Sequence, residues 1–312
     1  MITFVLRRLL AAVPVMAVVA FLVFSLLYFA PGDPATIIGG DLATPQEIAR
    51  IRSVLGLDQP FHVRLAIFIG QLLTGDLGIS IFSNLPVTHL IAQRIEPTLA
   101  LATVTILFSI VVAIPLGTIA AWRAESFVDR LVMVVSVLGF SVPVFVLGYG
   151  LIWLFAIKLQ WLPVQGYTPL SQGVWPWLAN LILPMLSLGT VYIALIARIT
   201  RASLLEVLAQ DYVRTAKAKG LGDRKVLGHA LGNAAVPIAT IVGIGIALLI
   251  GGVVVTETVF AIPGLGRLLV DAILRRDYPI IQGVTLLFAA VYVLINLVID
   301  ISYAVFDPRI RY

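Results

Sequence analysis

Cysteine does not occur in this 312-residue chain, and charged residues make up only 12% of it. Without cysteine the chain has no disulfide framework, no thiol nucleophile and no thiolate metal site. Soluble domains carry roughly 25% charged residues, about twice this share. The three histidines, His62, His89 and His229, are far apart in the sequence and predict no metal site.

Motifs for nucleotide binding and for intramembrane chemistry are also missing. No G-x-x-x-x-G-K-[ST] pattern occurs, so the chain has no P-loop that could cradle nucleotide phosphates. An intramembrane enzyme needs a nucleophile paired with a base, or clustered metal ligands, within its apolar stretches, and neither pattern is present. The sequence therefore predicts a non-catalytic chain with no catalytic, cofactor-binding or metal-binding residues.

Apolar residues dominate what is present: the chain is 60% hydrophobic, with a mean hydropathy of +1.06. A hydrocarbon layer about 30 Å thick requires about 20 apolar residues of helix, and helix is the default way to satisfy a backbone inside lipid. Six stretches free of Asp, Glu, Lys and Arg meet this requirement: Leu9–Ala30, Thr98–Trp122, Leu131–Ile157, Trp177–Ala197, Ala230–Thr256 and Tyr278–Ile299. We predict an all-α polytopic membrane protein with six transmembrane helices.

The net charge of +5 is interpreted as membrane topology and not as nucleic-acid binding. If the N-terminus is cytoplasmic, thirteen of the 21 Lys and Arg residues fall in inward-facing loops, as the positive-inside rule requires. We expect both termini to be cytoplasmic. The apolar core of a signal peptide is roughly 7–15 residues long, and the first apolar stretch is longer than this. We therefore interpret it as an uncleaved membrane anchor.

The chain divides into four predicted regions. These are an N-terminal transmembrane anchor helix (1–30), an external segment with short amphipathic helices (31–95), a membrane core of five helices (96–304) and a cytoplasmic tail (305–312). In the external segment, Thr44, Pro45 and Glu47 predict a capped helix start, and a second helix is expected after Pro60. This segment is interpreted as a structural cap over the core, with docking of an external partner as the alternative.

The cytoplasmic segment between the fourth and fifth apolar stretches is the most informative loop. It predicts a helix over about 206–220, because no Gly or Pro interrupts Glu206–Lys219 and Gly220 suits the position after a helix end. Small residues on this helix (Thr215, Ala216 and Ala218) would let the groove of another protein close around it. The alternative is a solvated basic loop that only obeys the positive-inside rule.

Several motifs resemble one family, the ABC importer permeases of the dipeptide, oligopeptide and nickel class, which are binding-protein-dependent transport inner-membrane components. The motifs cover nearly the whole chain: DYVRTAKAKG (Asp211–Gly220), PGDPA (Pro31–Ala35), LGLDQP (Leu55–Pro60), GDLG (75–78), ETVFAIPGLGRLLVDAI (Glu257–Ile273), RDYP (Arg276–Pro279) and DPRIRY (Asp307–Tyr312). The resemblance implies a type I ABC importer permease fold in the bacterial plasma (inner) membrane.

The resemblance also implies partners and a coupling helix. The partners would be a homologous second permease, two cytoplasmic ATP-binding subunits that hold ATP and magnesium, and an external solute-binding protein. The helix that sits in a cleft of one ATPase would carry Asp211, Tyr212, Arg214, Thr215, Ala216, Lys217, Ala218, Lys219 and Gly220.

A second candidate site lies after the fifth apolar stretch, where Glu257 precedes an irregular turn. Intramembrane acids call for a functional hypothesis. Glu257 could face the ammonium group of a solute or seal a gate with Arg267, and an acid that pairs with a loop arginine at the interface is the plainer alternative. The possible pathway or gate residues are Glu257, Pro263, Gly264, Gly266 and Arg267.

Two further features bear on how the helices pack. Gly243, Ala247 and Gly251 form a small-residue stripe, and such stripes let helices approach closely in lipid. Pro115, Pro143 and Pro184 lie inside apolar stretches, where each favours a kink.

The sequence thus favours a permease subunit of an ATP-driven importer for small peptides or related solutes, coupled to separate ATPases. The alternative is a stand-alone secondary transporter, which should show charges near the bilayer midplane or discontinuous helices within internal repeats. Peptides, nickel complexes, glutathione and other polar solutes all stay open as cargo.

Overall fold

The structure is a computed structural model, and it describes residues 2–29, 34–40, 43–54 and 56–306. In this part of the chain nearly every element is a helix, and the β-type pairing is one isolated bridge between Ile79 and Pro86. Positions 31–33 of the PGDPA motif and the whole DPRIRY segment (307–312) lie outside the described residues. The predicted all-α class is confirmed.

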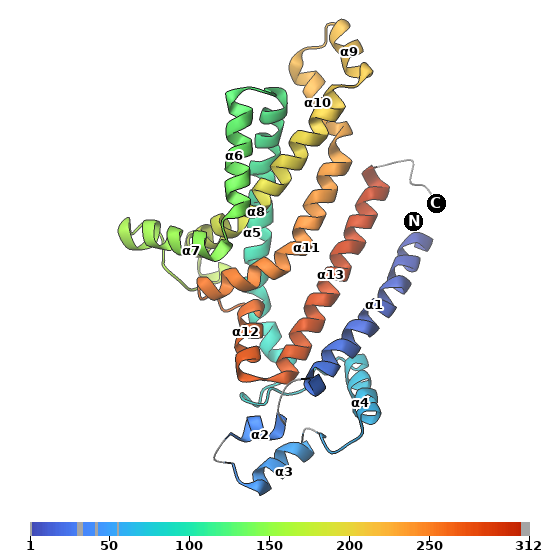
Figure 1. Cartoon of the computed structure of the whole chain (residues 1–312), viewed down its shortest axis with the longest axis vertical. Coiled ribbons are helices and arrows are strands. Elements are labelled where there is room, and N and C mark those ends of the chain that lie inside the picture. The colour runs from blue at the N-terminus through green and yellow to red at the C-terminus, as the bar shows by residue number, and fades with distance from the viewer. Residues whose placement is uncertain (1, 30–33, 41–42, 55, 307–312) are drawn as a thin grey trace. The chain divides into compact units, whose positions relative to one another are not determined.

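The helices follow one another in the chain as Figure 1 shows. Their bounds are α1 Ile2–Phe29, α2 Pro34–Gly39, α3 Pro45–Val54, α4 Phe61–Leu73, α5 Val87–Trp122, α6 Phe127–Ser141, α7 Val144–Leu151, η1 Ile152–Lys158, η2 Leu170–Gln172, α8 Val174–Leu208, α9 Asp211–Ala218, α10 Asp223–Asn233, α11 Ala235–Val259, α12 Leu265–Arg275 and α13 Tyr278–Phe306.

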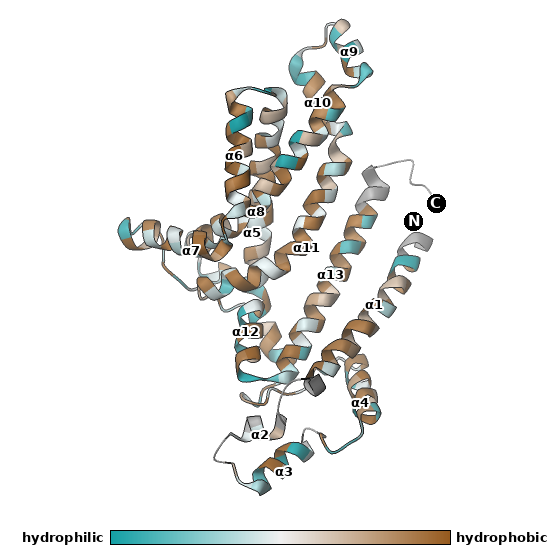
Figure 2. Ribbon diagram, viewed as in Figure 1, coloured by the Kyte–Doolittle hydropathy of each residue, from teal (hydrophilic) through white to brown (hydrophobic). Residues whose placement is uncertain are grey.

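Five of the described helices, α1, α5, α8, α11 and α13, are long and apolar enough to cross a membrane. Brown, hydrophobic colour runs along most of their length in Figure 2. They coincide with five of the six predicted spans. The sixth prediction, Leu131–Ile157, needs a correction, because this stretch is not one straight helix.

The stretch breaks at Pro143 into α6 and the pair α7 and η1, which are bent by 101° to each other. Proline lacks the N–H that would continue the helix, and Val142 before it takes extended backbone with ψ of 124°. The kink predicted at Pro143 is therefore a complete break between two helices. Alone, the 15-residue α6 is about 22 Å long at 1.5 Å per residue, shorter than a hydrocarbon layer.

The described contacts divide the chain into two compact units. The first contains Met1–Val5, Pro97–Arg267 and Leu294–Tyr312, and the second contains Leu6–Glu96 and Leu268–Val293. Both units draw on segments that are distant in the sequence. The predicted linear division at residues 30, 95 and 304 stays a prediction.

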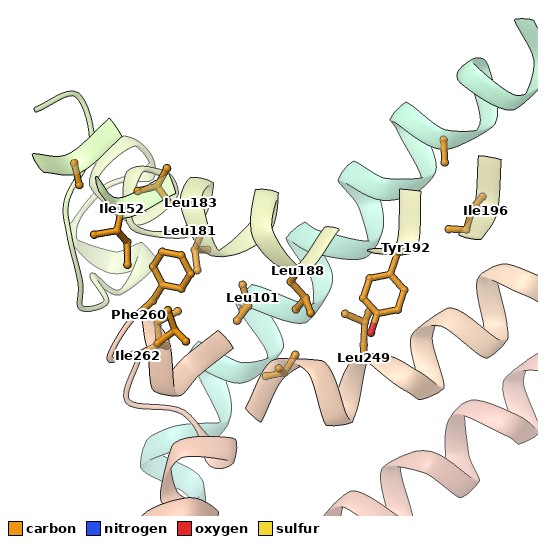
Figure 3. Packing of buried hydrophobic residues seen from close by; sticks show 14 of the residues in the cluster. Leu101, Ile152, Leu181, Leu183, Leu188, Tyr192, Ile196, Leu249, Phe260 and Ile262 are labelled. Carbon is orange, nitrogen blue, oxygen red and sulfur yellow. The ribbon is translucent and has the colours of Figure 1, made fainter. Parts of the chain in front are cut away.

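Helix α8 is the centre of the first unit. It packs against α6, α7 and α11, and its side chains form a buried cluster with residues of α5 and α11. Figure 3 shows Leu188 and Tyr192 of α8 beside Leu249 of α11, with Leu101 of α5 nearby. Dense packing of this kind holds helices together in lipid, where the hydrophobic effect between them is lost.

Glycines set how closely these helices approach. A Cβ on Gly117 of α5 would lie 2.5 Å from the Ala197 carbonyl oxygen of α8, and one on Gly243 of α11 would lie 2.5 Å from Ile299 of α13. Gly251 is exposed, and a Cβ there would meet nothing within 4 Å. The predicted stripe on α11 is therefore packed at Gly243 but open at Gly251.

The second unit contains the two predicted short helices. Thr44 and Glu47 form the expected capping box: the Thr44 N–H donates to the Glu47 carboxylate at 2.8 Å, and the Glu47 N–H donates to the Thr44 hydroxyl at 3.3 Å. The backbone bond from Thr44, with a second bond from its hydroxyl, lowers the pKa of Glu47. Helix α3 begins at Pro45 and α4 begins directly after Pro60, as predicted.

Helix α4 is joined to α1 by aromatic packing. The ring of Phe24 on α1 lies 5.4 Å from that of Phe61 and 5.2 Å from that of Phe68, between centroids. The Arg64 guanidinium lies 5.9 Å from the centre of the Phe24 ring. This packing attaches α4 to α1 within their unit.

The close approach at Gly117 leads to a stability prediction. Gly117→Ala should lower the free energy of unfolding by about 1–3 kcal/mol, because the new methyl group meets a backbone oxygen that cannot rotate away. Thermal unfolding of the detergent-solubilised protein measures the change. Gly251→Ala is the matched control and should leave the melting temperature unchanged or raise it; equal melting of both variants would contradict the packing argument.

Candidate functional sites: helix α9 and the Glu257 junction

Helix α9 is the main candidate site, and its start differs from the prediction. Helix α8 ends at Leu208, Gln210 takes extended backbone with ψ of 150°, and α9 begins at Asp211. The predicted helix over 206–220 is therefore two helices with a break at 209–210. No glycine or proline marks this break, and α9 packs against α10 after it.

The end of α9 agrees with the prediction. Gly220 has φ of +80°, in the left-handed region that glycine adopts without steric cost. The Leu221 N–H donates to the Ala216 carbonyl at 3.1 Å, and the Gly220 N–H donates to the Lys217 carbonyl at 2.9 Å. This is the Schellman arrangement, so Gly220 is confirmed as the residue that ends the helix.

The faces of α9 differ in exposure. Val213 is buried, and Ala216 is half-buried in a groove of about 370 Å³ between α9 and α10. Ala216 therefore lies on the inner face of α9 and not on the open surface expected for it. The exposed candidates are Asp211, Tyr212, Arg214, Thr215, Lys217, Ala218, Lys219 and Gly220. Figure 2 shows hydrophilic colour on α9, in contrast to the brown of α6 and α11.

The charged side chains on the open face of α9 have few partners among the described residues. The Arg214 guanidinium lies 3.6 Å from the Asp211 carboxylate, and both side chains are over four-fifths exposed. Such a pair contributes little to stability. The Lys217 ammonium lies 5.4 Å from the centre of the Trp122 ring at the end of α5. Helix α9 thus presents a short, mostly basic surface that its own unit leaves open.

The second candidate site is a buried junction of α5, α11 and α12, which we call the Glu257 junction (Thr98, Glu257, Gly264, Leu265 and Arg267). Glu257 is fully buried. Its carboxylate accepts bonds from the Thr98 hydroxyl at 2.5 Å and from the Arg267 N–H at 3.0 Å. The Leu265 N–H donates to the Thr98 hydroxyl at 2.8 Å. These bonds satisfy N–H groups of the first turn of α12, which have no partner within the helix.

The glycines of the turn make room for this carboxylate. A Cβ on Gly264 would overlap the Glu257 carboxylate, and one on Gly266 would lie 2.6 Å from the Val254 Cα atom. Ala261 has φ of +51°, and its carbonyl accepts a bond from the Arg267 guanidinium at 3.0 Å. No larger residue fits at Gly264 or Gly266, because neighbouring atoms of α11 lie too close to both.

This geometry bears on the proposed gate. The structure brings Glu257, Gly264, Gly266 and Arg267 together, whereas the Pro263 side chain is exposed. Because Glu257 is fully buried, it does not present a charge to a solute in this conformation. In this conformation Glu257 anchors the turn through the Thr98 hydroxyl and the Arg267 backbone N–H, and its role in a pathway or gate stays a prediction.

Two buried acids were missed by the sequence reading. The Asp129 carboxylate accepts two bonds from the Arg201 guanidinium, at 2.5 Å and 2.6 Å. The Asp277 carboxylate accepts a bond from the Ser80 hydroxyl at 2.6 Å. A signal existed for Asp129, because Ser126 three residues before it fits a capping box, but no local pattern reveals partners 72 and 197 residues away.

Two family models match this chain. Residues 113–312 match the model described as the binding-protein-dependent transport system inner membrane component, and residues 1–102 match the model of the N-terminal part of these membrane components. The chain belongs to this family. It is a multi-pass inner-membrane permease of an ABC importer, and the predicted resemblance is confirmed.

Named relatives extend along the full length of this permease. A probable peptide ABC transporter permease of Sinorhizobium fredii is 54% identical over 310 residues, which cover 99% of each chain. A putative peptide transport system permease of Brucella abortus is 45% identical over 309 residues, covering 99% of this chain and 98% of the relative. The glutathione transport system permease GsiC of Salmonella paratyphi A is 44% identical over 313 residues, covering all of both chains.

A solved structure supports the fold. A chain of the inward-facing MetNI methionine ABC transporter superposes with a TM-score of 0.59 and 18% identity, covering 70% of this permease and 97% of that chain. The type I ABC importer permease fold is therefore confirmed.

The Glu257 junction predicts a stability effect at Thr98. Thr98→Val keeps the shape of the side chain but removes the hydroxyl that joins Leu265 to Glu257, and it should cost about 1–3 kcal/mol of unfolding free energy. Thermal unfolding in detergent measures the loss. Thr258→Val is the matched control, since Thr258 is exposed and its hydroxyl bonds the Val254 carbonyl of its own helix. Equal losses in both variants would argue against the junction.

Proposed function

We propose that this permease imports short peptides or related solutes as part of a larger assembly. The assembly contains a homologous second permease, two ATP-binding subunits and an external solute-binding protein. The observation that carries the proposal is the full-length similarity, at 54% identity, to a probable peptide permease. The glutathione permease supports the same solute class, because glutathione is itself a tripeptide. ATP and magnesium are bound by the partner subunits.

Helix α9 is the proposed coupling helix that docks into one ATP-binding subunit. It is short and exposed along one face, and it lies with α10 at one end of α8 and α11 (Figure 1). The small exposed side chains Thr215 and Ala218 would let a partner groove close on the helix, and Lys217 and Lys219 suit the negative end of its dipole.

The placement of buried acids supports an ATP-driven permease over a stand-alone secondary transporter. In many secondary transporters the substrate and coupling-ion sites lie near the bilayer midplane. Among the described residues, the buried acids are Asp129, Glu257 and Asp277. Asp129 lies in the first turn of α6, Glu257 in the last turn of α11, and Asp277 just before α13. All three acids lie at helix ends and bind groups of the protein there.

A docking experiment tests the coupling role of α9. In an importer reconstituted with its ATPases and binding protein, Ala218→Glu should lower peptide uptake at least about tenfold, because a buried unpaired charge opposes docking strongly. Ser171→Glu adds the same charge to an exposed residue of the short helix η2, away from α9 in the sequence, and serves as the control. Uptake by the Ala218→Glu variant that matches the control would remove the docking assignment.

Single-cysteine labelling tests the orientation. The natural chain has no cysteine, so Lys219→Cys introduces one reactive thiol at an exposed site. A membrane-impermeant maleimide should label it in inverted membrane vesicles and leave it unlabelled in intact spheroplasts. Labelling in spheroplasts would place α9 outside and would refute both the topology and the ATPase contact.

A further inference from the structure

Helix α9 is not held by a continuous helical backbone on either side. The break at 209–210 separates it from α8, and the left-handed Gly220 separates it from α10. A force applied to α9 is therefore not transmitted to α8 or α10 through a continuous helix. What fixes the orientation of α9 must be the contacts that its side chains make with neighbouring helices.

One of these contacts joins α9 to the start of a membrane helix. The Asn233 amide nitrogen donates a hydrogen bond of 2.7 Å to the Tyr212 hydroxyl. Tyr212 is the second residue of α9, and Asn233 is the last residue of α10, two residues before α11 begins at Ala235. The bond thus connects α9 directly to the α10–α11 corner, 21 residues further along the chain.

A second contact fixes the other half of α9. Lys217 lies over the ring of Trp122, the last residue of α5, at 5.4 Å from its centre. Tyr212 and Lys217 are five residues apart, so the two contacts are about 7.5 Å apart along the helix axis. Between them Val213 is buried, and it lines the groove with Val226 of α10. Two separated contacts resist rocking of α9, which one contact alone would permit.

We propose that Tyr212 and Asn233 are positioning residues that transmit movement of α9 to α11. This inference rests on the proposed function of α9. The pair keeps α9 at a fixed angle to the α10–α11 corner, so that displacement of α9 by the ATPase moves the membrane helix instead of rotating α9 in place. Tyr212 was expected to contact the ATPase, and its hydroxyl has this second, internal role.

The test separates transmission from docking by measuring two quantities in the complete reconstituted importer: peptide uptake and ATP hydrolysis. Tyr212→Phe removes the hydroxyl, and Asn233→Leu removes the amide at similar size. In each variant we expect uptake per ATP hydrolysed to fall by about twofold to tenfold, the range that loss of one hydrogen bond can produce. In Asn233→Leu, which changes α10 and leaves every residue of α9 intact, copurification of the ATPases and the rate of hydrolysis should stay close to wild type.

Three further variants test whether the effect comes from the Tyr212–Asn233 hydrogen bond. The double variant should be no worse than either single one, because both remove the same bond. Asn233→Asp should restore coupling, since the Tyr212 hydroxyl can donate to a carboxylate. Gly228→Ala changes the same helix at a position where a Cβ meets nothing within 4 Å, and it should behave as wild type.

The outcomes distinguish this inference from the proposed function. Normal uptake per ATP in both Tyr212→Phe and Asn233→Leu, with Ala218→Glu still defective, would overturn the transmission role and leave the docking role in place. Loss of the ATPases from Asn233→Leu would assign the pair to docking and would overturn the transmission role. A normal Ala218→Glu variant would refute the docking role itself.

Discussion

A backbone that crosses a hydrocarbon layer has to satisfy its own hydrogen bonds, and the rest of this structure depends on that requirement. Long helices meet it, and the sites where the helical ladder stops are where polar side chains gather. The first turn of α12 receives the Thr98 hydroxyl and the Glu257 carboxylate. The start of α6 receives Ser126, and its Asp129 binds Arg201 of α8. Buried acids in this permease thus serve as structural partners at helix ends.

Close approach between helices is the second requirement, and glycine meets it at some positions but serves other purposes elsewhere. Gly117 admits the backbone of α8, and Gly264 admits a carboxylate. Gly220 ends a helix with a positive φ, and Gly251 has open space around it. The same amino acid therefore serves helix packing, polar contact and chain reversal, and only the surroundings tell these uses apart.

The unit that contains α9 combines rigidity with an exposed appendage. Helix α8 is buried along much of its length, whereas α9 is exposed on most of its surface and joined by non-helical residues at both ends. An element that receives force from another subunit needs such an open face, and it also needs contacts that prevent it from moving alone. In the coupling role proposed for α9, the Tyr212–Asn233 bond and the Lys217–Trp122 contact would meet this second need.

The sequence alone determined the features that depend on local composition: the apolar helices, the capping box at Thr44 and Glu47, the end of α9 at Gly220 and the break favoured by Pro143. Each follows from the length of an apolar run or from the backbone preference of one residue. The motifs also determined the family, because each is a continuous stretch of sequence and their order along the chain can be compared directly.

Only the tertiary structure decided where α9 begins, which face Ala216 occupies and what the buried acids bind. The break at 209–210 lacks glycine and proline, so no local residue preference predicts it. The partners of Asp129, Asp277 and Glu257 lie 72, 197 and 159 residues away. Contacts over such separations are set by how whole helices pack, and no local sequence preference records that packing.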